Sequence, residues 1–482
     1  MSLSLLPTAA PNRSGFTAPS PSSLVARLGA ALASRGVAYC QWKGHGKRER
    51  WGNGKGDIDL LVERASWADF ADILAGLGFK LAAAPAGREA NGVLHFFGLD
   101  ERRGDLVHVH AYQRLAIGSP WRTHYRIPLE RDLLASAQLQ EDGVFKTAAP
   151  ELELIVLVLR LVLRHEVWDV LRREPPRWLD GALTELDRLE ERATPAQVAT
   201  ALKKLLPEVS PRLFERCRAS LLPGCPARRR VLIRAQLTNA LRPHASRPTV
   251  FAFSERLWRR VQPRGQALAG GGAVVALLGG DGSGKSTCAE ALKAWLGSEL
   301  ATLHLHLGRP PRSIATYVVG GALKLARALR LSPSLIAHLD LLRTVATGMD
   351  RARLETRAFR FAADGGIAIC ERYPLKPGWS LSGPSDAQGH ATEARSRFAT
   401  ALRRYERGLY ERMARPDLVF VLALDPETAV RRKTSEPADY VRERAKLTAA
   451  ADWSQIGAVI IDAAQPLPQV VAALKAELWK SL

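Results

Sequence analysis

Residues 273–287 read AVVALLGGDGSGKST, and this stretch decides the fold of the second half of the chain. Its apolar start, Ala273–Leu278, is typical of a buried strand, and Gly279–Thr287 fits the pattern G-x-x-x-x-G-K-[ST]. A helical segment, Cys288–Leu296, follows the pattern. A strand, a glycine-rich loop and a helix in this order predict a phosphate-binding loop, because backbone N–H groups and the helix N-terminus attract phosphate oxygens.

The loop predicts a site for ATP and Mg²⁺. We expect Lys285 to reach the β- and γ-phosphates and the Ser286 hydroxyl to ligate Mg²⁺. The motif by itself does not distinguish a kinase from an ATPase. The expected ATP-binding residues are Gly279, Asp281, Gly282, Ser283, Gly284, Lys285, Ser286 and Thr287.

The pattern after residue 272 alternates between strands and helices. Such alternation after a phosphate-binding loop predicts an α/β fold with a parallel sheet that is covered by helices on both faces. The expected strands are Ala273–Leu278, Thr302–Leu307, Gly366–Cys370, Leu418–Leu424 and Ala458–Ile461.

Three ordered motifs over residues 272–482 resemble those of thymidylate kinases. The first is the loop. The second is Asp350-Arg351, which is expected to open a helix before the strand Ile367–Cys370, followed by Glu371-Arg372-Tyr373. The third is Arg415–Pro426, with a basic lid after it. The family usually has Asp in place of Glu371, and Pro374–Pro384 does not match the family's acceptor segment, so the acceptor stays open.

The resemblance implies phosphoryl transfer from ATP to a small phosphorylated acceptor, such as the nucleoside monophosphate thymidylate. Arg351, Arg372 and Tyr373 would bind the acceptor. Lid cations would neutralise charge on the transferred phosphoryl group, and lid closure would exclude water. The implied catalytic residues are Lys285, Glu371, Arg372, Arg431 and Arg432, with Lys433 as a further lid cation.

A second candidate site lies near the N-terminus, where residues 56–62 read GDIDLLV. Asp57 and Asp59 are two apart on an expected strand and therefore share a face, where paired carboxylates can bind Mg²⁺ beside a triphosphate. With the preceding Lys-Gly at 43–44, the pattern over residues 24–147 resembles nucleotidyltransferases. Where a third carboxylate is expected, the chain has His108 and His110, which either complete the metal site or mark it as degenerate.

The chain carries a formal net charge of +21, which favours anionic partners. Residues 203–264 hold fifteen Lys and Arg against three Glu, a surplus of +12. This basic segment is expected to bind an anionic membrane surface or nucleic acid, or to be a solvated surface. A homodimer is a further partner that the sequence leaves open.

The five cysteines form no C-x-x-C pair, which argues against a disulfide scaffold or zinc ribbon and favours a cytoplasmic protein. We find no apolar run long enough to span a membrane and no signal-peptide pattern. The expected segments are a disordered tail at 1–22, an α+β nucleotidyltransferase-like domain at 23–147, a basic helical connector and linker at 148–271, and a thymidylate kinase-like P-loop domain at 272–482.

Two other functions remain alternatives to the kinase. In the first, the N-terminal domain is a nucleotidyltransferase and the P-loop domain supplies or senses nucleotide. In the second, ATP switches a protein that binds nucleic acid or a membrane surface.

Overall fold

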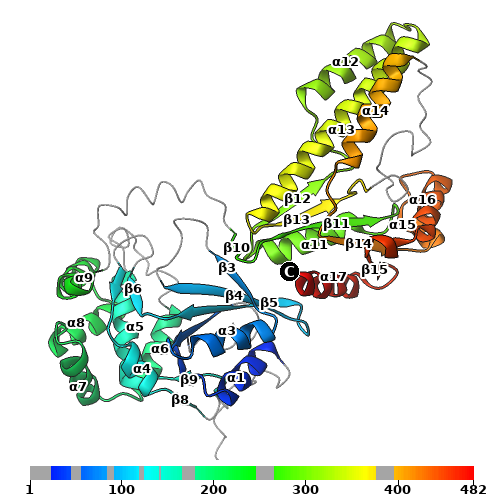
Figure 1. Cartoon of the computed structure of the whole chain (residues 1–482). Helices are drawn as coiled ribbons and strands as arrows, with labels where there is room; N and C mark the ends of the chain where they lie inside the picture. The colour runs from blue at the N-terminus through cyan, green and yellow to red at the C-terminus, as the bar shows by residue number, and fades with distance from the viewer. Residues whose placement is uncertain are drawn as a thin grey trace, which may run out of the picture. The chain divides into compact units, whose positions relative to one another are not determined.

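The computed structural model divides into two compact units, which are described separately (Figure 1). Among the described residues, the first unit contains 23–79, 92–102 and 106–245, and the second contains 80–83, 103–105 and 265–482. The tail expected at 1–22 lies outside the described residues, as do residues 246–264 of the basic segment and 376–384 after Tyr373. The structure describes residues 23–44, 56–83, 92–118, 124–140, 143–164, 180–245, 265–375 and 396–482.

A mixed sheet forms the centre of the first unit, with neighbouring strands in the order β4-β5-β2-β1-β9-β8. Strand β2 runs parallel to β5 and antiparallel to β1. The strands of this unit are β1 (Tyr39–Lys43), β2 (Asp57–Val62), β4 (Val93–Asp100), β5 (Asp105–Tyr112), β8 (Gln138–Leu139), β9 (Lys146–Thr147) and the hairpin β6 (Ala116–Gly118) with β7 (His124–Arg126). The helices before residue 147 are α1 (Leu24–Ser34), α3 (Trp67–Gly76) and α4 (Glu130–Ala135).

The helices of residues 150–240 belong to this same unit. Their buried side chains, among them Leu157, Phe214 and Leu237, share one apolar core with Trp42 and Tyr112 of the sheet. The boundary that we expected at 147 therefore does not coincide with the end of a unit, because the connector helices bury their apolar faces against the sheet. They are α5 (Pro150–Arg164), α6 (Asp180–Glu190), α7 (Pro195–Leu205), α8 (Pro211–Leu221) and α9 (Ala227–Ala240), followed by the 3₁₀ turn Arg242–His244.

The second unit contains a five-stranded sheet whose paired strands are all parallel, in the order β12-β13-β11-β14-β15. This confirms the predicted α/β fold. The strands are β11 (Ala273–Gly279), β12 (Thr302–His306), β13 (Ile367–Glu371), β14 (Leu418–Ala423) and β15 (Val459–Asp462). A short pair, β3 (Lys80–Ala83) with β10 (Ala267–Leu268), also falls in this unit.

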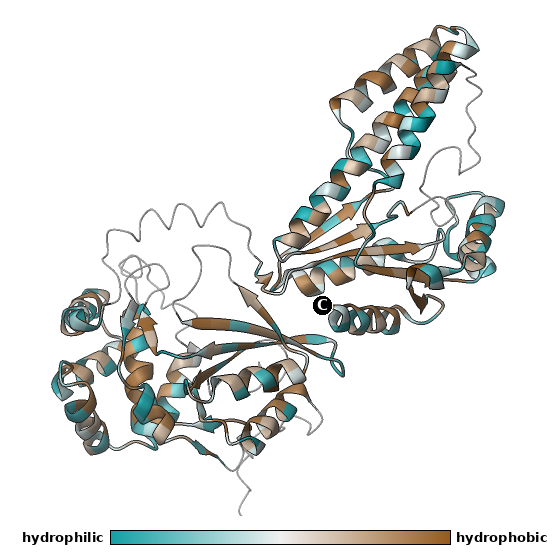
Figure 2. Cartoon of the chain, in the orientation of Figure 1, coloured by the Kyte–Doolittle hydropathy of each residue, from teal (hydrophilic) through white to brown (hydrophobic). Residues whose placement is uncertain are grey.

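Helices cover both faces of this parallel sheet (Figure 1). Helix α13 packs on β11, β12 and β13, whereas α11 and α17 pack on each other and on the other face. The central strand β11 is buried along almost its whole length and is apolar throughout (Figure 2). Each buried Val or Leu side chain there contributes about 1.5–3 kcal/mol. The helices are α11 (Lys285–Gly297), α12 (Ile314–Ala328), α13 (Pro333–Ala363), α14 (Arg397–Glu411), α15 (Pro426–Arg432), α16 (Ala438–Ala450) and α17 (Leu467–Ser481).

Helix α13 differs from the prediction at its beginning. It starts at Pro333, after the N-cap Ser332, and not at Asp350. The cap and a proline in the first turn begin the helix there, since proline has no N–H to satisfy at that position. Asp350 instead lies buried within the helix and accepts hydrogen bonds from the Ser313 amide and the Thr316 hydroxyl at the start of α12. It joins two helices and does not open one.

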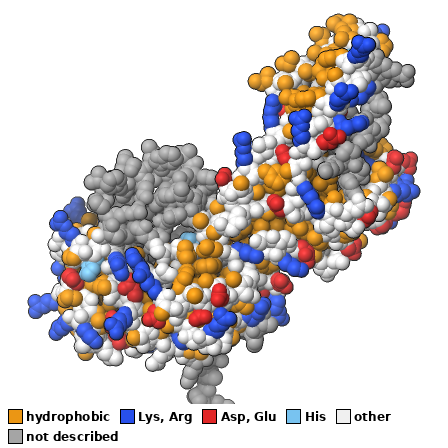
Figure 3. Space-filling view, in the orientation of Figure 1, with side chains coloured by type: hydrophobic (Ala, Val, Ile, Leu, Met, Phe, Trp, Pro, Cys, Tyr) orange, Lys and Arg blue, Asp and Glu red, His pale blue; other side chains and the backbone are white. Residues whose placement is uncertain are grey.

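Helix α12 carries an exposed apolar face (Figure 3). The homodimer that the sequence leaves open stays a prediction. No helix of the described residues has the length and apolarity needed to cross a membrane. The exposed apolar side chains of α12 are Ile314, Tyr317, Val318 and Leu325.

Candidate functional site

The glycine-rich loop joins the end of β11 to the start of α11, as the sequence predicts. Gly282 has φ +82° and Gly284 has φ +85°, a left-handed conformation that favours glycine. A Cβ atom at Gly282 would lie 2.7 Å from the carbonyl oxygen of Ala429, so that position excludes a side chain. The loop backbone therefore depends on glycine for both its conformation and its packing.

We expect Gly282→Ala to weaken ATP binding at least about fivefold, because a strained backbone of this kind costs at least about 1 kcal/mol. Isothermal titration calorimetry measures the effect. The matched control is Gly297→Ala, since Gly297 ends α11 and a Cβ atom added there would meet no other atom within 4 Å. Equal ATP affinity in the two variants would contradict a requirement for glycine in the loop.

Lys285 turns its side chain back into the loop. Its Nζ atom donates to the Gly280 carbonyl over 2.6 Å, and the residue is buried. Burial, with the nearby Arg372 guanidinium, lowers the pKa of Lys285 to about 8. The ammonium group therefore lies among the loop groups that would surround a phosphate.

The lowered pKa predicts that ATP affinity falls as the pH rises above about 8. The ammonium form binds phosphate, so above its pKa the free protein must take up a proton when ATP binds. The ATP affinity then falls by up to about tenfold for each pH unit. Below about pH 8 Lys285 is already charged and its contribution is constant. Calorimetry in two buffers of different ionisation heat measures the proton uptake. The Lys285→Arg variant keeps its charge at these pH values, so its ATP affinity should no longer fall as the pH rises. An unchanged pH dependence in this variant would show that another group takes up the proton.

Glu371 ends β13, and the parallel register places it beside Leu277 of β11. Its Oε2 atom accepts a hydrogen bond from the Ser286 hydroxyl over 2.6 Å. Its Oε1 atom lies 2.8 Å from His304 Nε2. The structure thus brings together the two predicted oxygen groups, Glu371 and Ser286, and hydroxyl and carboxylate oxygens suit Mg²⁺.

Asp281 holds two arginines at the loop. Arg372 forms an ion pair with Asp281 Oδ1, and Arg444 Nε lies 2.9 Å from Asp281 Oδ2. Burial raises the pKa of Asp281, but the two guanidinium groups outweigh it and hold the pKa below its usual value. Arg372 also has a left-handed φ of +53°. The loop thus carries two cations beside Lys285.

The predicted lid arginines have other partners. Arg431 donates to the Thr428 hydroxyl over 2.5 Å, and Arg432 donates to the Ala463 carbonyl over 2.8 Å. Arg444 of α16, which was not predicted as a site residue, contacts the loop together with Arg372. No local signal in the sequence indicates Arg444, because its contact depends on how α16 packs.

Two of the predicted acceptor residues, Arg351 and Tyr373, lie in different surroundings. Arg351 donates to the Leu307 carbonyl over 3.0 Å and to the Tyr410 hydroxyl over 2.5 Å. Tyr373, in contrast, is fully buried and donates to the Ala414 carbonyl, which places it in the core and away from a ligand surface. The strand end positions Arg372, but the next residue turns inward.

His304 lies on β12 and was not predicted as a site residue. It connects Glu371 to Glu290, whose Oε1 atom lies 3.1 Å from His304 Nδ1. The alternation of His304 and His306 on β12 was the available signal, since β12 pairs with β13 and places His306 opposite Glu371.

Asp57 and Asp59 lie on β2 as predicted, and cationic or polar side chains surround both. Asp59 Oδ1 lies 2.9 Å from Lys43 Nζ and 3.1 Å from His110 Nδ1, and it accepts from the Tyr112 hydroxyl. His108 Nδ1 lies 3.0 Å from Asp57 Oδ1. The parallel register explains these pairs, because it places Asp57 opposite His108 and Asp59 opposite His110.

A third histidine, His95 of β4, joins this group and was not predicted as a site residue. Its Nδ1 atom lies 3.1 Å from His108 Nε2. Burial and the neighbouring histidines lower the pKa of His95 to about 3, so its ring is neutral at neutral pH. No local signal in the sequence indicates His95, because only the pairing of β4 with β5 brings it to the cluster.

The second unit is thus an α/β domain in which a glycine-rich loop of the phosphate-binding pattern follows the central strand of a parallel sheet. No family model matches the chain. The chain is similar to the "Uncharacterized ATP-binding protein YghS" of Escherichia coli (strain K12), with 28% identity over 219 residues. The similarity covers 42% of this chain and 90% of that protein.

Proposed function

We propose that the second unit binds ATP on Gly279–Thr287 and, with Mg²⁺, transfers the γ-phosphoryl group to a small phosphorylated acceptor. The observation that carries the proposal is the convergence of Lys285, Ser286 and Glu371 at the loop. The similarity to a protein named as ATP-binding supports the choice of nucleotide. The acceptor is proposed to be a nucleoside monophosphate such as thymidylate, on the motif resemblance alone.

Ser286 of the loop and Glu371 of β13 fit a bound Mg²⁺ ion. Their hydroxyl and carboxylate oxygens would either ligate the ion or accept hydrogen bonds from water molecules that ligate it. When bound, the ion would neutralise charge on the phosphates. Lys285 would leave the Gly280 carbonyl and bind the β- and γ-phosphates. This exchange replaces a hydrogen bond from the ammonium group to a neutral carbonyl by one to a charged phosphate oxygen, which is stronger.

Asp281 would keep Arg372 and Arg444 close to the transferred group. Their guanidinium groups are positioned before ATP arrives, so little reorganisation is needed to stabilise charge that develops during transfer. Arg431, Arg432 and Lys433 remain proposed lid cations, which would have to change partners to reach the phosphates. Arg351 remains the proposed acceptor ligand beside Arg372.

A product assay tests the proposal. The full chain is incubated with ATP, Mg²⁺ and a panel of nucleoside and sugar phosphates, and the products are separated by chromatography. Acceptor-dependent ADP with a phosphorylated acceptor supports the kinase. Pyrophosphate release would instead support the nucleotidyltransferase alternative through Asp57 and Asp59. ATP binding without either product would support the switch alternative.

The basic segment 203–264 is proposed as the surface for an anionic membrane or nucleic acid in that switch. Its described part is folded, and α9 presents the exposed Arg228 and Arg229 while burying Ile233 and Leu237. The exposed cations therefore lie on a helix that contributes Ile233 and Leu237 to the core. Phe251–Arg260, the aromatic and basic stretch expected to add stacking, lies outside the described residues.

A further inference from the structure

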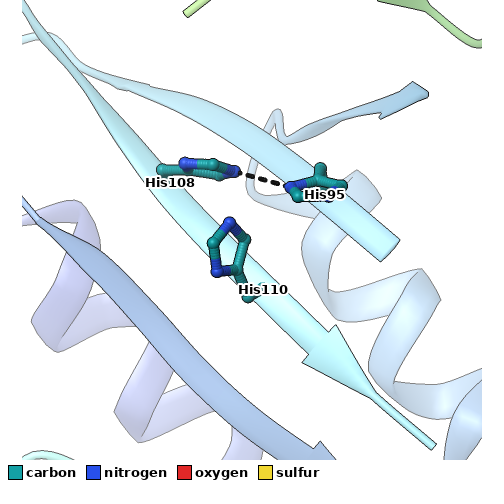
Figure 4. A group of neighbouring side chains, drawn as sticks. All are labelled: His95, His108 and His110. Atoms are coloured by element: carbon teal, nitrogen blue, oxygen red, sulfur yellow. Dashed lines mark hydrogen bonds between the residues drawn. The ribbon is translucent and has the colours of Figure 1, made fainter. Parts of the chain in front are cut away.

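Three histidines of the first unit direct ring nitrogens toward one another (Figure 4). His95 lies on β4, and His108 and His110 lie on β5. One nitrogen from each ring lies within 4.8 Å of the others, and His95 Nδ1 is 3.1 Å from His108 Nε2. Figure 4 shows one nitrogen of His110 pointing toward the other two rings. Three imidazoles from two neighbouring strands thus converge on one point.

Two carboxylates bind the outer nitrogens of this cluster. Asp57 contacts His108 Nδ1 over 3.0 Å, and Asp59 contacts His110 Nδ1 over 3.1 Å. A carboxylate at Nδ1 holds the proton there and leaves the lone pair on Nε2. Metal-binding histidines almost always have such a partner on the ring nitrogen that does not bind the metal.

The spacing of two of these nitrogens fits a transition metal, and the nitrogen of His110 lies within 4.8 Å of both. Zinc–nitrogen bonds of about 2.0–2.1 Å in a tetrahedron place two ligand nitrogens about 3.3 Å apart. The distance between His95 Nδ1 and His108 Nε2 is within a few tenths of an ångström of this value. Phe97 stacks on His108 with the ring centroids 4.1 Å apart, which fixes the plane of that imidazole.

We propose that His95, His108 and His110 form a binding site for a divalent transition-metal ion, with Zn²⁺ as the best fit. Imidazole ligands select metals such as zinc over Mg²⁺, which prefers oxygen. Three protein ligands leave the fourth position for water or a substrate oxygen, as in catalytic zinc sites. Asp57 and Asp59 are then positioning residues that orient His108 and His110.

This site is independent of the proposed kinase, which is in the other unit. The full chain is stripped with a chelator and then titrated with Co²⁺ and with Zn²⁺ in the presence of excess Mg²⁺. We expect saturable binding, with the visible absorption bands of Co²⁺ bound to nitrogen in a low-symmetry site, and a higher melting temperature with Zn²⁺.

His95→Gln is the main variant, because His95 is less buried than His108 and its loss disturbs the fold less. It should abolish the absorption bands, and Asp57→Asn should weaken metal affinity about 10–100-fold. The control is His244→Gln, since His244 pairs with Glu208 in the same unit and is outside the cluster. His110→Gln, with circular dichroism of each variant, separates loss of a ligand from loss of fold.

Metal binding by the variants distinguishes a metal site from a hydrogen-bonded histidine cluster. Loss of metal binding in folded His95→Gln and His110→Gln proteins, with binding kept in the control, supports the site. Equal metal affinity in all variants, or no binding by the unsubstituted chain, overturns it and leaves the histidines as a hydrogen-bonded cluster.

Discussion

Replacing Lys285 with alanine is expected to lower ATP turnover at least about 100-fold while leaving the second unit folded. The ammonium group is the cation that the loop itself encloses, with its Nζ atom 2.6 Å from the Gly280 carbonyl. Loss of one preorganised donor to developing negative charge costs about 100–1000-fold in rate. Because Lys285 makes this contact at the loop and not in the apolar core, its removal should cost little stability.

Lys293→Ala is the matched control for this variant. Lys293 lies on the same helix, α11, but its side chain is 48% exposed and pairs with Glu290. Turnover is measured as ADP release with the best acceptor from the panel, and thermal unfolding checks the fold. A folded Lys285→Ala protein with the turnover of the Lys293→Ala protein would remove the kinase proposal.

The parts of the fold that the sequence predicts are those with local signals. The five strands of the parallel sheet lie within two residues of their expected ends, because each is a short apolar run with turn or helix signals beside it. The beginning of α13 was missed because Asp350-Arg351 was interpreted by resemblance. Ser332-Pro333, a cap followed by proline, was the stronger physical signal.

The parts of the site that the sequence could not predict depend on packing. Arg444 reaches Asp281 only because α16 folds back over the loop, and His95 meets His108 only because β4 pairs with β5. Tyr373 shows the reverse error, since its motif suggested a ligand contact and the fold buries it. Sequence spacing indicates which side chains share an element, but not which elements become neighbours.

The placement of Glu371 depends both on a local sequence signal and on packing between elements. Its position at a strand end was predicted, whereas its simultaneous contact with Ser286 and His304 was not. The resembled family has the shorter Asp here. The longer Glu side chain spans the distance from β13 to the start of α11 on one side and to β12 on the other. Its carboxylate is therefore fixed by partners from two other elements, with 2% of the residue exposed.

Glu371→Gln is expected to lower kcat about 10–100-fold, with the larger loss at limiting Mg²⁺. Glutamine keeps the length of the side chain but lacks the charge that attracts a divalent cation, and loss of a partner that orients metal ligands costs about this factor. The measurement is ADP release as a function of Mg²⁺ concentration. The expected result is a higher Mg²⁺ requirement together with the lower kcat.

Two further variants identify the cause of that effect. Glu411→Gln removes an exposed carboxylate of the same unit and should leave the Mg²⁺ requirement unchanged. Glu371→Asp restores the charge on a side chain one methylene shorter, so it should recover part of the activity if charge is the important property. If Glu371→Gln is folded and has the kcat and Mg²⁺ dependence of the Glu411→Gln protein, Glu371 is a structural partner of Ser286 and His304 and takes no part in holding the ion.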